Sequence, residues 1–197
     1  MKKFLLLILM IGSIFSQETT FGEVEAKKYN DLLGRFIDTS FSFSYMPDTE
    51  RLGMYQKSAL ATSIHVMTLD NRDTLIKIVD KYLEWRETAI ENEVKIQKKI
   101  EIDFNSIAAF MYGGELYLSE NGKMYGTLFS RSEKKHELVL TFEELVSTSN
   151  EYITHKPDIL YIKYEDVLNL KKLISDENIE KVIEEINKQK DVDNLFN

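Results

Sequence analysis

The stretch MYGGELYLSENGKMYGTLFSR, Met111 to Arg131, holds four of the eight glycines of this chain. Gly113-Gly114 and Asn121-Gly122 each fit the centre of a two-residue hairpin turn, where both residues need a positive φ. Apolar and polar residues alternate around these turns, as they do in antiparallel strands with one solvated face. A phosphate-binding glycine loop would instead lie between a strand and a helix. The stretch therefore predicts a β-meander.

The turns also predict a register for the meander. The first turn sets Phe110 opposite Tyr117, the second sets Tyr117 opposite Gly126, and a third turn of four residues sets Phe129 opposite Leu138. A one-residue slip at any turn would divide the apolar residues between the two faces. We therefore expect one core face, with Gly126 leaving room for the Tyr117 ring. This face comprises Ile107, Ala109, Met111, Leu116, Leu118, Tyr125, Phe129, Leu138, Leu140 and Phe142.

The second face of the meander also carries large side chains. Phe110, Tyr112, Tyr117 and Met124 fall together on it in the predicted register. Tyrosine and methionine are enriched in the cores of interfaces. If this face is exposed, these four residues are the predicted ligand-binding surface; if a helix covers it, they belong to the core.

Periodic patterns predict the other elements. Apolar residues at helical spacing indicate a long helix over about 72–91, with Asp70 and Asn71 as candidate N-caps. Alternating or β-branched segments predict strands at 41–45, 57–69, 94–104 and 158–164, and helical spacing predicts helices at 143–153, 165–175 and 176–190. We therefore expect a single α+β domain, in which an antiparallel β-meander sheet is packed by the long helix and two C-terminal helices.

The N-terminus, MKKFLLLILMIGSIFSQETT, has the layout of a secretory signal peptide. Lys2 and Lys3 precede an apolar run, and Ser16 is a small residue suited to a cleavage site. We predict a signal peptide over 1–16, with an uncleaved N-terminal anchor as the alternative. Residues 17–28 read as a polar and mobile leader, and 29–197 as the single domain.

Composition limits the partners. The net charge is −8, and loss of residues 1–16 removes two lysines and no acid, which brings it to −10. Phosphate binding depends on clustered Lys and Arg, so nucleic acid and an anionic membrane are unfavourable partners. The basic pairs Lys98-Lys99, Lys134-Lys135 and Lys171-Lys172 read as solvated surface. We predict a periplasmic or extracellular protein without membrane insertion after signal cleavage, whose partner is an unknown protein or envelope component.

Motifs for chemistry are missing from the sequence. The chain has no cysteine and no G-x-S-x-G elbow, and its histidines, His65, His136 and His155, are far apart without zinc-site spacing. We therefore predict no catalytic residues, no metal and no cofactor. The favoured function is a non-catalytic exported binding or interaction protein. The alternative is a small envelope-acting hydrolase that uses paired carboxylates, for which the candidates are Glu143-Glu144, Glu184-Glu185 and Glu84 with Glu87.

Overall fold

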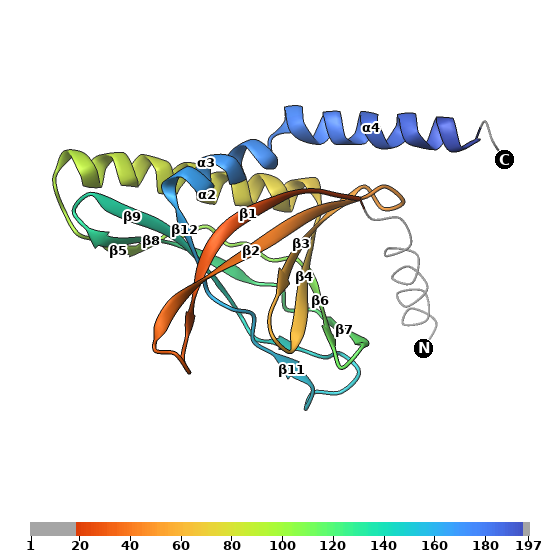
Figure 1. The fold of residues 1–197 in the computed structure, drawn as a ribbon, viewed down its shortest axis with the longest axis horizontal. Coiled ribbons are helices and arrows are strands. Elements are labelled where there is room, and N and C mark those ends of the chain that lie inside the picture. The colour runs from red at the N-terminus through yellow and green to blue at the C-terminus, as the bar shows by residue number, and fades with distance from the viewer. Residues whose placement is uncertain (1–18, 195–197) are drawn as a thin grey trace.

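The computed structural model describes residues 19–194, which form one α+β domain with an open antiparallel sheet of ten strands and three helices (Figure 1). The predicted fold class is therefore confirmed, while the predicted signal peptide over 1–16 lies outside the described residues. The elements are β1 (Thr19–Asn30), β2 (Arg35–Met46), β3 (Arg51–Lys57), β4 (Ala61–Met67), α2 (Leu69–Glu91), β5 (Gln97–Lys99), β6 (Ile107–Tyr112), β7 (Glu115–Ser119), β8 (Met124–Ser132), β9 (Lys135–Phe142), β10 (Leu145–Val146), β11 (Thr154–His155), β12 (Leu160–Lys163), α3 (Tyr164–Leu173) and α4 (Asp176–Asn194).

The strands of the sheet follow the order β5-β8-β9-β12-β1-β2-β3-β4-β6-β7, and β10 pairs with β11 in a separate small ladder. The three helices lie on the same face of the sheet (Figure 1), where one hydrophobic core includes side chains of all three. The helices and the residue that follows α3 contribute nine side chains to this core: Leu75, Ile78, Val79, Tyr82, Val167, Leu170, Ile174, Ile179 and Val182. Across residues 19–194, no helix combines the length and apolar character needed to cross a membrane.

Helix α2 confirms the predicted long helix and begins three residues before its predicted start. Its N-cap is Thr68, whose hydroxyl accepts a hydrogen bond from the Asn71 N–H at 3.3 Å. Asn71 Oδ1 in turn accepts from the Thr68 N–H at 3.2 Å. This reciprocal pair is a capping box, so Asn71 lies inside the helix and is not its cap.

The turn at Gly113-Gly114 is confirmed, with φ values of +60° and +85°. Phe110 pairs with Tyr117 between β6 and β7, as predicted. The faces nevertheless differ from the prediction: Phe110 points into the protein and Met111 is exposed, whereas Ala109 is buried as predicted. The register of a hairpin follows from its turn, but which face is buried depends on what packs against it.

The hairpin predicted at Asn121-Gly122 is wrong. Strand β7 is one edge of the sheet, and β8 lies beside β5 at the other end of the strand order, so Tyr117 does not face Gly126. Gly122 serves close packing here, because a Cβ on it would lie 2.3 Å from the carbonyl oxygen of Ser106. The same close approach lets the Ser106 N–H donate to the Gly122 carbonyl at 3.3 Å.

The third turn lies where it was predicted, but it has two residues in place of four, because Ser132 pairs with Lys135, and the strands slip beyond it. A β-bulge between Ser130 and Ser132 shifts the β8–β9 pairing by one residue, so Leu128 faces Leu138 in place of Phe129. Such a shift turns the side chains of a strand to the opposite faces. Leu128 is consequently buried, and Phe129 lies on the other side of the sheet, half-buried.

Gly126 has a different neighbour from the one predicted. A Cβ at this position would lie 2.4 Å from Cγ2 of Ile78 and 3.3 Å from Cδ1 of Ile100. The missing side chain therefore lets helix α2 approach β8 closely, and the Tyr117 ring plays no part in it.

Three further predictions need correction. The polar leader over 17–28 is strand from Thr19 onward, and β1 is a central strand between β12 and β2. The predicted helix over 143–153 is the β10 strand and the loop toward β11. The predicted strand over 94–104 contracts to β5 and a bridge at Phe104. The local patterns did not show which strand each segment pairs with: β1 pairs with β2 and β12, β10 pairs with β11, and β5 pairs with β8.

Candidate anion-binding site

The structure does not place the four predicted binding residues on one exposed strip. Phe110 and Met124 are fully buried, and they belong to different hydrophobic clusters. Tyr112 is exposed, and Tyr117 is half-buried with its ring stacked on Phe110 at a centroid distance of 5.3 Å. Binding by all four residues together would require two of them to leave the core.

The cover over Phe110 comes from the β10–β11 segment, and not from a helix. Leu145 of β10 is buried in the same cluster, and Ile153 packs against it. The Thr148 N–H donates to the Leu118 carbonyl at 2.8 Å, which ties this segment to the edge strand β7. Phe110 therefore belongs to the core, as expected for a covered face.

Among the candidate carboxylates, the surroundings of Glu143 do not suit a general acid. Glu143 accepts hydrogen bonds from the Tyr125 hydroxyl and the Asn121 side-chain amide, and these bonds lower the pKa of Glu143. A general acid of a glycosidase requires a raised pKa. Metal chemistry also lacks ligands in the described part of the chain, where no group of three or more His, Cys, Asp or Glu side chains could hold a metal ion.

A different site appears where five separate segments meet. A cavity of about 480 Å³ lies among β1, β2, α2, the β8–β9 hairpin and the β12–α3 junction. Cationic side chains dominate its wall. The lining residues are Lys27, Phe36, Arg86, Arg131, Lys134, Lys135, His136, Glu137, Lys163, Tyr164 and Glu165. We call this the basic cavity.

The bulge in β8 positions one wall of the basic cavity. It falls at Arg131, whose guanidinium lies 4.1 Å from the Phe36 ring and donates from Nε to Glu137 at 2.7 Å. His136 fixes the hairpin behind it, because its ring nitrogens contact Ser130 Oγ at 2.6 Å and the Glu133 carbonyl at 2.9 Å. Lys134 in the hairpin turn and Lys135 at the start of β9, both exposed, also line the cavity.

Helix α2 supplies Arg86 to the opposite wall. Its guanidinium carbon lies 3.5 Å from the centre of the Tyr164 ring, a stacked cation–π contact. Stacking uses the flat face of the guanidinium and leaves its N–H edge available. The Arg86 Nε is buried and has no hydrogen-bond partner. A buried donor without an acceptor is costly. Because this nitrogen is closed off from solvent, only the remaining N–H groups of Arg86 could reach an anion in the cavity that this residue lines.

The start of α3 contributes backbone donors. Lys163 is the N-cap of this ten-residue helix and makes no side-chain capping hydrogen bond. Lys163, Tyr164 and Glu165 all line the basic cavity. The partial positive charge of a helix N-terminus favours anions. The carboxylate of Glu165 in the first turn neutralises part of this charge.

The local charge is opposite to that of the whole chain. Six Lys or Arg side chains and two Glu side chains line the cavity, whereas the chain carries 33 acids against 25 bases. Glu137 pairs with Arg131, and Lys27 pairs at 3.5 Å with the largely exposed Asp38. The remaining cations of the lining have no ion pair in the described structure. The cavity therefore favours an anion electrostatically.

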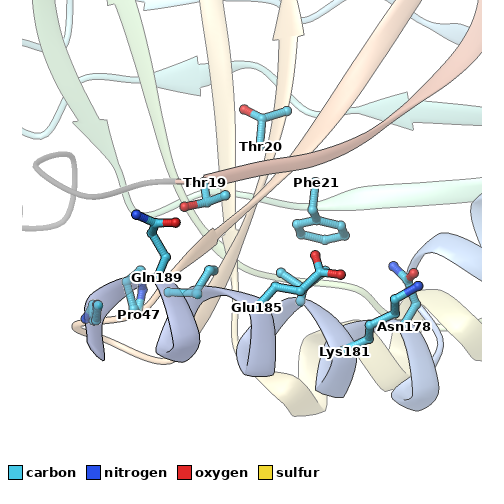
Figure 2. Close-up of a pocket in the computed structure, with 11 residues that line it drawn as sticks. Thr19, Thr20, Phe21, Pro47, Asn178, Lys181, Glu185 and Gln189 are labelled. Atoms are coloured by element: carbon cyan, nitrogen blue, oxygen red, sulfur yellow. The ribbon is translucent and has the colours of Figure 1, made fainter. Parts of the chain in front are cut away.

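A second hollow, of about 470 Å³, lies between helix α4 and the first residues of β1 (Figure 2). The Phe21 ring points toward the helix there, with Glu185 and Lys181 close by (Figure 2). Two lysines and one glutamate are among its described lining residues, and one of them, Lys190, lies 4.0 Å from Asp48. Its charges are nearly balanced, so it offers a ligand less selectivity than the basic cavity.

The basic cavity was missed in the sequence, where Lys134-Lys135 looked like solvated surface. Its cations run from Lys27 to Lys163 and come together through strand pairing between distant segments. The sequence signal for this cavity was the pair Lys134-Lys135, close to Arg131. It was not distinctive, because the chain contains other lysine pairs.

Comparison with known protein families, curated proteins and solved structures finds no match. The class of protein is therefore described from its own geometry. It is an acidic α+β domain whose long helix and curved sheet assemble a cationic cavity.

Proposed function

We propose that this chain is an exported, non-catalytic binding protein that holds an anionic group in the basic cavity. The observation that carries the proposal is the gathering of six cationic side chains around one cavity of an acidic chain. Like charges brought together repel each other and reduce stability. A bound anion would neutralise that repulsion, which gives the arrangement a physical reason.

The donors suit a phosphate or carboxylate group. A guanidinium can present two parallel N–H donors to either group, and Arg86 and Arg131 are both held in place by aromatic rings. Phe36 and Tyr164 add apolar wall. The volume falls within the range of roughly 300–1,000 Å³ typical of small-ligand sites. We infer a ligand with an anionic group attached to a less polar body.

Export is the second part of the proposal. It rests on the signal-like segment over 1–16 and places the mature protein in the periplasm or outside the cell. The ligand would then belong to an envelope component or to another exported protein. Intact-mass measurement of natively produced protein tests this part: loss of the N-terminal segment supports export, and a retained Met1 contradicts signal cleavage.

Calorimetric titration with inorganic phosphate and with citrate tests the cavity. The variant Lys134→Gln with Lys135→Gln removes two cations of the lining that make no ion pair in the described structure. We expect about a tenfold or greater loss of affinity, since each charge-assisted contact is worth about 1.5 kcal/mol or more. The control, Lys171→Gln with Lys172→Gln, makes the same charge change on two exposed neighbouring lysines of α3 that are not part of the cavity lining. Lys171 pairs with Asp80 at 2.7 Å, and an exposed ion pair of this kind contributes at most about 1 kcal/mol to stability.

The two variants separate specific binding from general attraction. Retained affinity in the α3 control and reduced affinity in the hairpin variant support the site. Equal losses would show that net charge alone governs binding, and no heat with either anion would remove the proposed ligand chemistry.

A further inference from the structure

The turn between β1 and β2 presents two leucines to solvent. Leu32 is 98 % exposed, the highest value among the large apolar residues of the described chain, and Leu33 is 57 % exposed. The turn is ordered, because the Leu33 N–H donates to Asn30 Oδ1 at 2.9 Å and Gly34 adopts a φ of +60°. The hairpin extends away from the helices toward the lower left of Figure 1. The protein therefore holds two leucines out in water, with the exposed Asp31 before them and the exposed Arg35 after Gly34.

A layer of aromatic rings follows directly behind the tip. Tyr29 and Phe36 form the second strand pair counted from the turn, and their ring centroids are 5.3 Å apart. Phe36 in turn contacts the Tyr161 ring at 4.8 Å. Aromatic side chains with one polar end favour the boundary between water and an apolar phase.

The basic cavity forms the third layer. Lys27 and Phe36 of the hairpin line it, and Arg131 stacks on the Phe36 ring. Leu33 is three residues from Phe36, a reach of about 10 Å at the rise of an extended strand. The exposed leucines, the aromatic rings and the cations thus follow one another over a short distance. A lipid surface has a corresponding order from inside to outside: acyl chains, the interfacial region and the phosphate groups.

We propose that the β1–β2 tip inserts shallowly into an anionic lipid surface, and that the basic cavity receives a lipid phosphate. This inference rests on the proposed function, because it names a lipid headgroup as the anion. It departs from the expectation of no membrane insertion, which rested on the net charge of the whole chain. Shallow insertion of two leucines needs no membrane-spanning segment. Charges beyond about one Debye length, about 8 Å, are screened in physiological salt. The local cations can therefore dominate contact, although the whole chain is acidic.

A lipid surface fits better than a protein partner because the cavity that Lys27 and Phe36 of the hairpin help to line gathers cations behind the tip. A partner protein would need an apolar recess bordered by acids, whereas an anionic membrane presents apolar chains under a continuous layer of phosphates. Lysines near such a surface each contribute about fivefold in binding.

Vesicle co-sedimentation tests the proposal with the mature chain, recovered after export and shown by mass to lack the N-terminal segment. Vesicles of phosphatidylcholine with about 30 % phosphatidylglycerol supply anionic headgroups, and pure phosphatidylcholine is the control. We expect Leu32→Ser with Leu33→Ser to reduce partitioning into the anionic vesicles by about tenfold or more, the value of burying one leucine. The matched control is Leu60→Ser, which alters another exposed leucine, 76 % exposed, before β4.

The expected pattern is binding that needs phosphatidylglycerol, is reduced by the tip variant and by Lys134→Gln with Lys135→Gln, and is unchanged by Leu60→Ser. Absence of vesicle binding would overturn the lipid inference, while calorimetry with inorganic phosphate would still decide the proposed function. Binding that survives loss of both leucines would show that the tip does not insert. A dimer in solution that the tip variant dissociates, without vesicle binding, would assign the tip to a second copy of the chain.

Discussion

Substitution of Gly126 tests the tertiary arrangement against the register that the sequence predicted. In the structure, a methyl group at this position would meet Cγ2 of Ile78 at 2.4 Å, well inside the 3.4–4 Å of ordinary contact. That carbon is attached to the Cβ of a buried side chain on α2 and cannot swing aside. Gly126→Ala should therefore push helix and strand apart by roughly 1 Å, at a cost of about 1–3 kcal/mol typical of overpacking.

A double-mutant cycle identifies the neighbour. Ile78→Ala alone should cost about 2–5 kcal/mol by opening a cavity. In the double variant the new methyl group occupies part of that cavity, so the combined loss should be smaller than the sum by about 1 kcal/mol or more. The predicted hairpin placed Tyr117 across Gly126, and in that arrangement Tyr117→Ala would couple to Gly126→Ala.

Urea unfolding of the single and double variants measures these terms through the midpoint at constant slope. Coupling of Gly126 to Ile78, with additivity toward Tyr117, supports the structure. Additivity toward Ile78 would refute the close approach of α2 to β8.

The remaining predictions concern buried side chains. Burial lowers the pKa of His65 to about 4 from the 6.5 of an unfolded histidine, so the unfolded state binds more protons between these values. The free energy of unfolding should be steady above about pH 7 and fall by about 3 kcal/mol as the pH drops from 6.5 to 4. Urea unfolding at several pH values should show most of this slope lost in His65→Gln, and an unchanged slope would contradict the assignment. Thermal and urea unfolding should show a loss of about 3–5 kcal/mol for Phe110→Ala and within about 0.5 kcal/mol for the exposed Tyr112→Ala. Similar small effects at both positions would mean that Phe110 is exposed after all.

Net charge proved a poor guide to the local electrostatics. The sequence total predicts repulsion of anions, and this holds for the protein seen from a distance. When a ligand is in contact with the protein, the nearest charges determine the electrostatic attraction, because salt screens the more distant ones. The basic cavity places Arg86, Arg131, Lys134, Lys135 and Lys163 within one small region, and sequence totals cannot express such a grouping.

Local features of the sequence were sufficient where the interaction itself is local. Helix α2 follows from apolar spacing within 23 residues, although its cap is Thr68 and not the predicted Asp70 or Asn71. The turn at Gly113-Gly114 follows from two residues that tolerate positive φ, and it set the β6–β7 register correctly. These elements depend on neighbours a few positions away, so residue order alone determines them.

The tertiary structure decided everything that depends on partners distant in sequence. Strand β1 has few apolar residues, yet Val24 is fully buried because β2, β12 and α3 surround it. The bulge at Arg131 shifted a register that the turn alone had set, and it brought this guanidinium onto Phe36. The basic cavity joins side chains from Lys27 to Lys163. Packing and strand pairing minimise the free energy of the whole chain, so the faces, the bulge and the site emerge only when all segments are assembled.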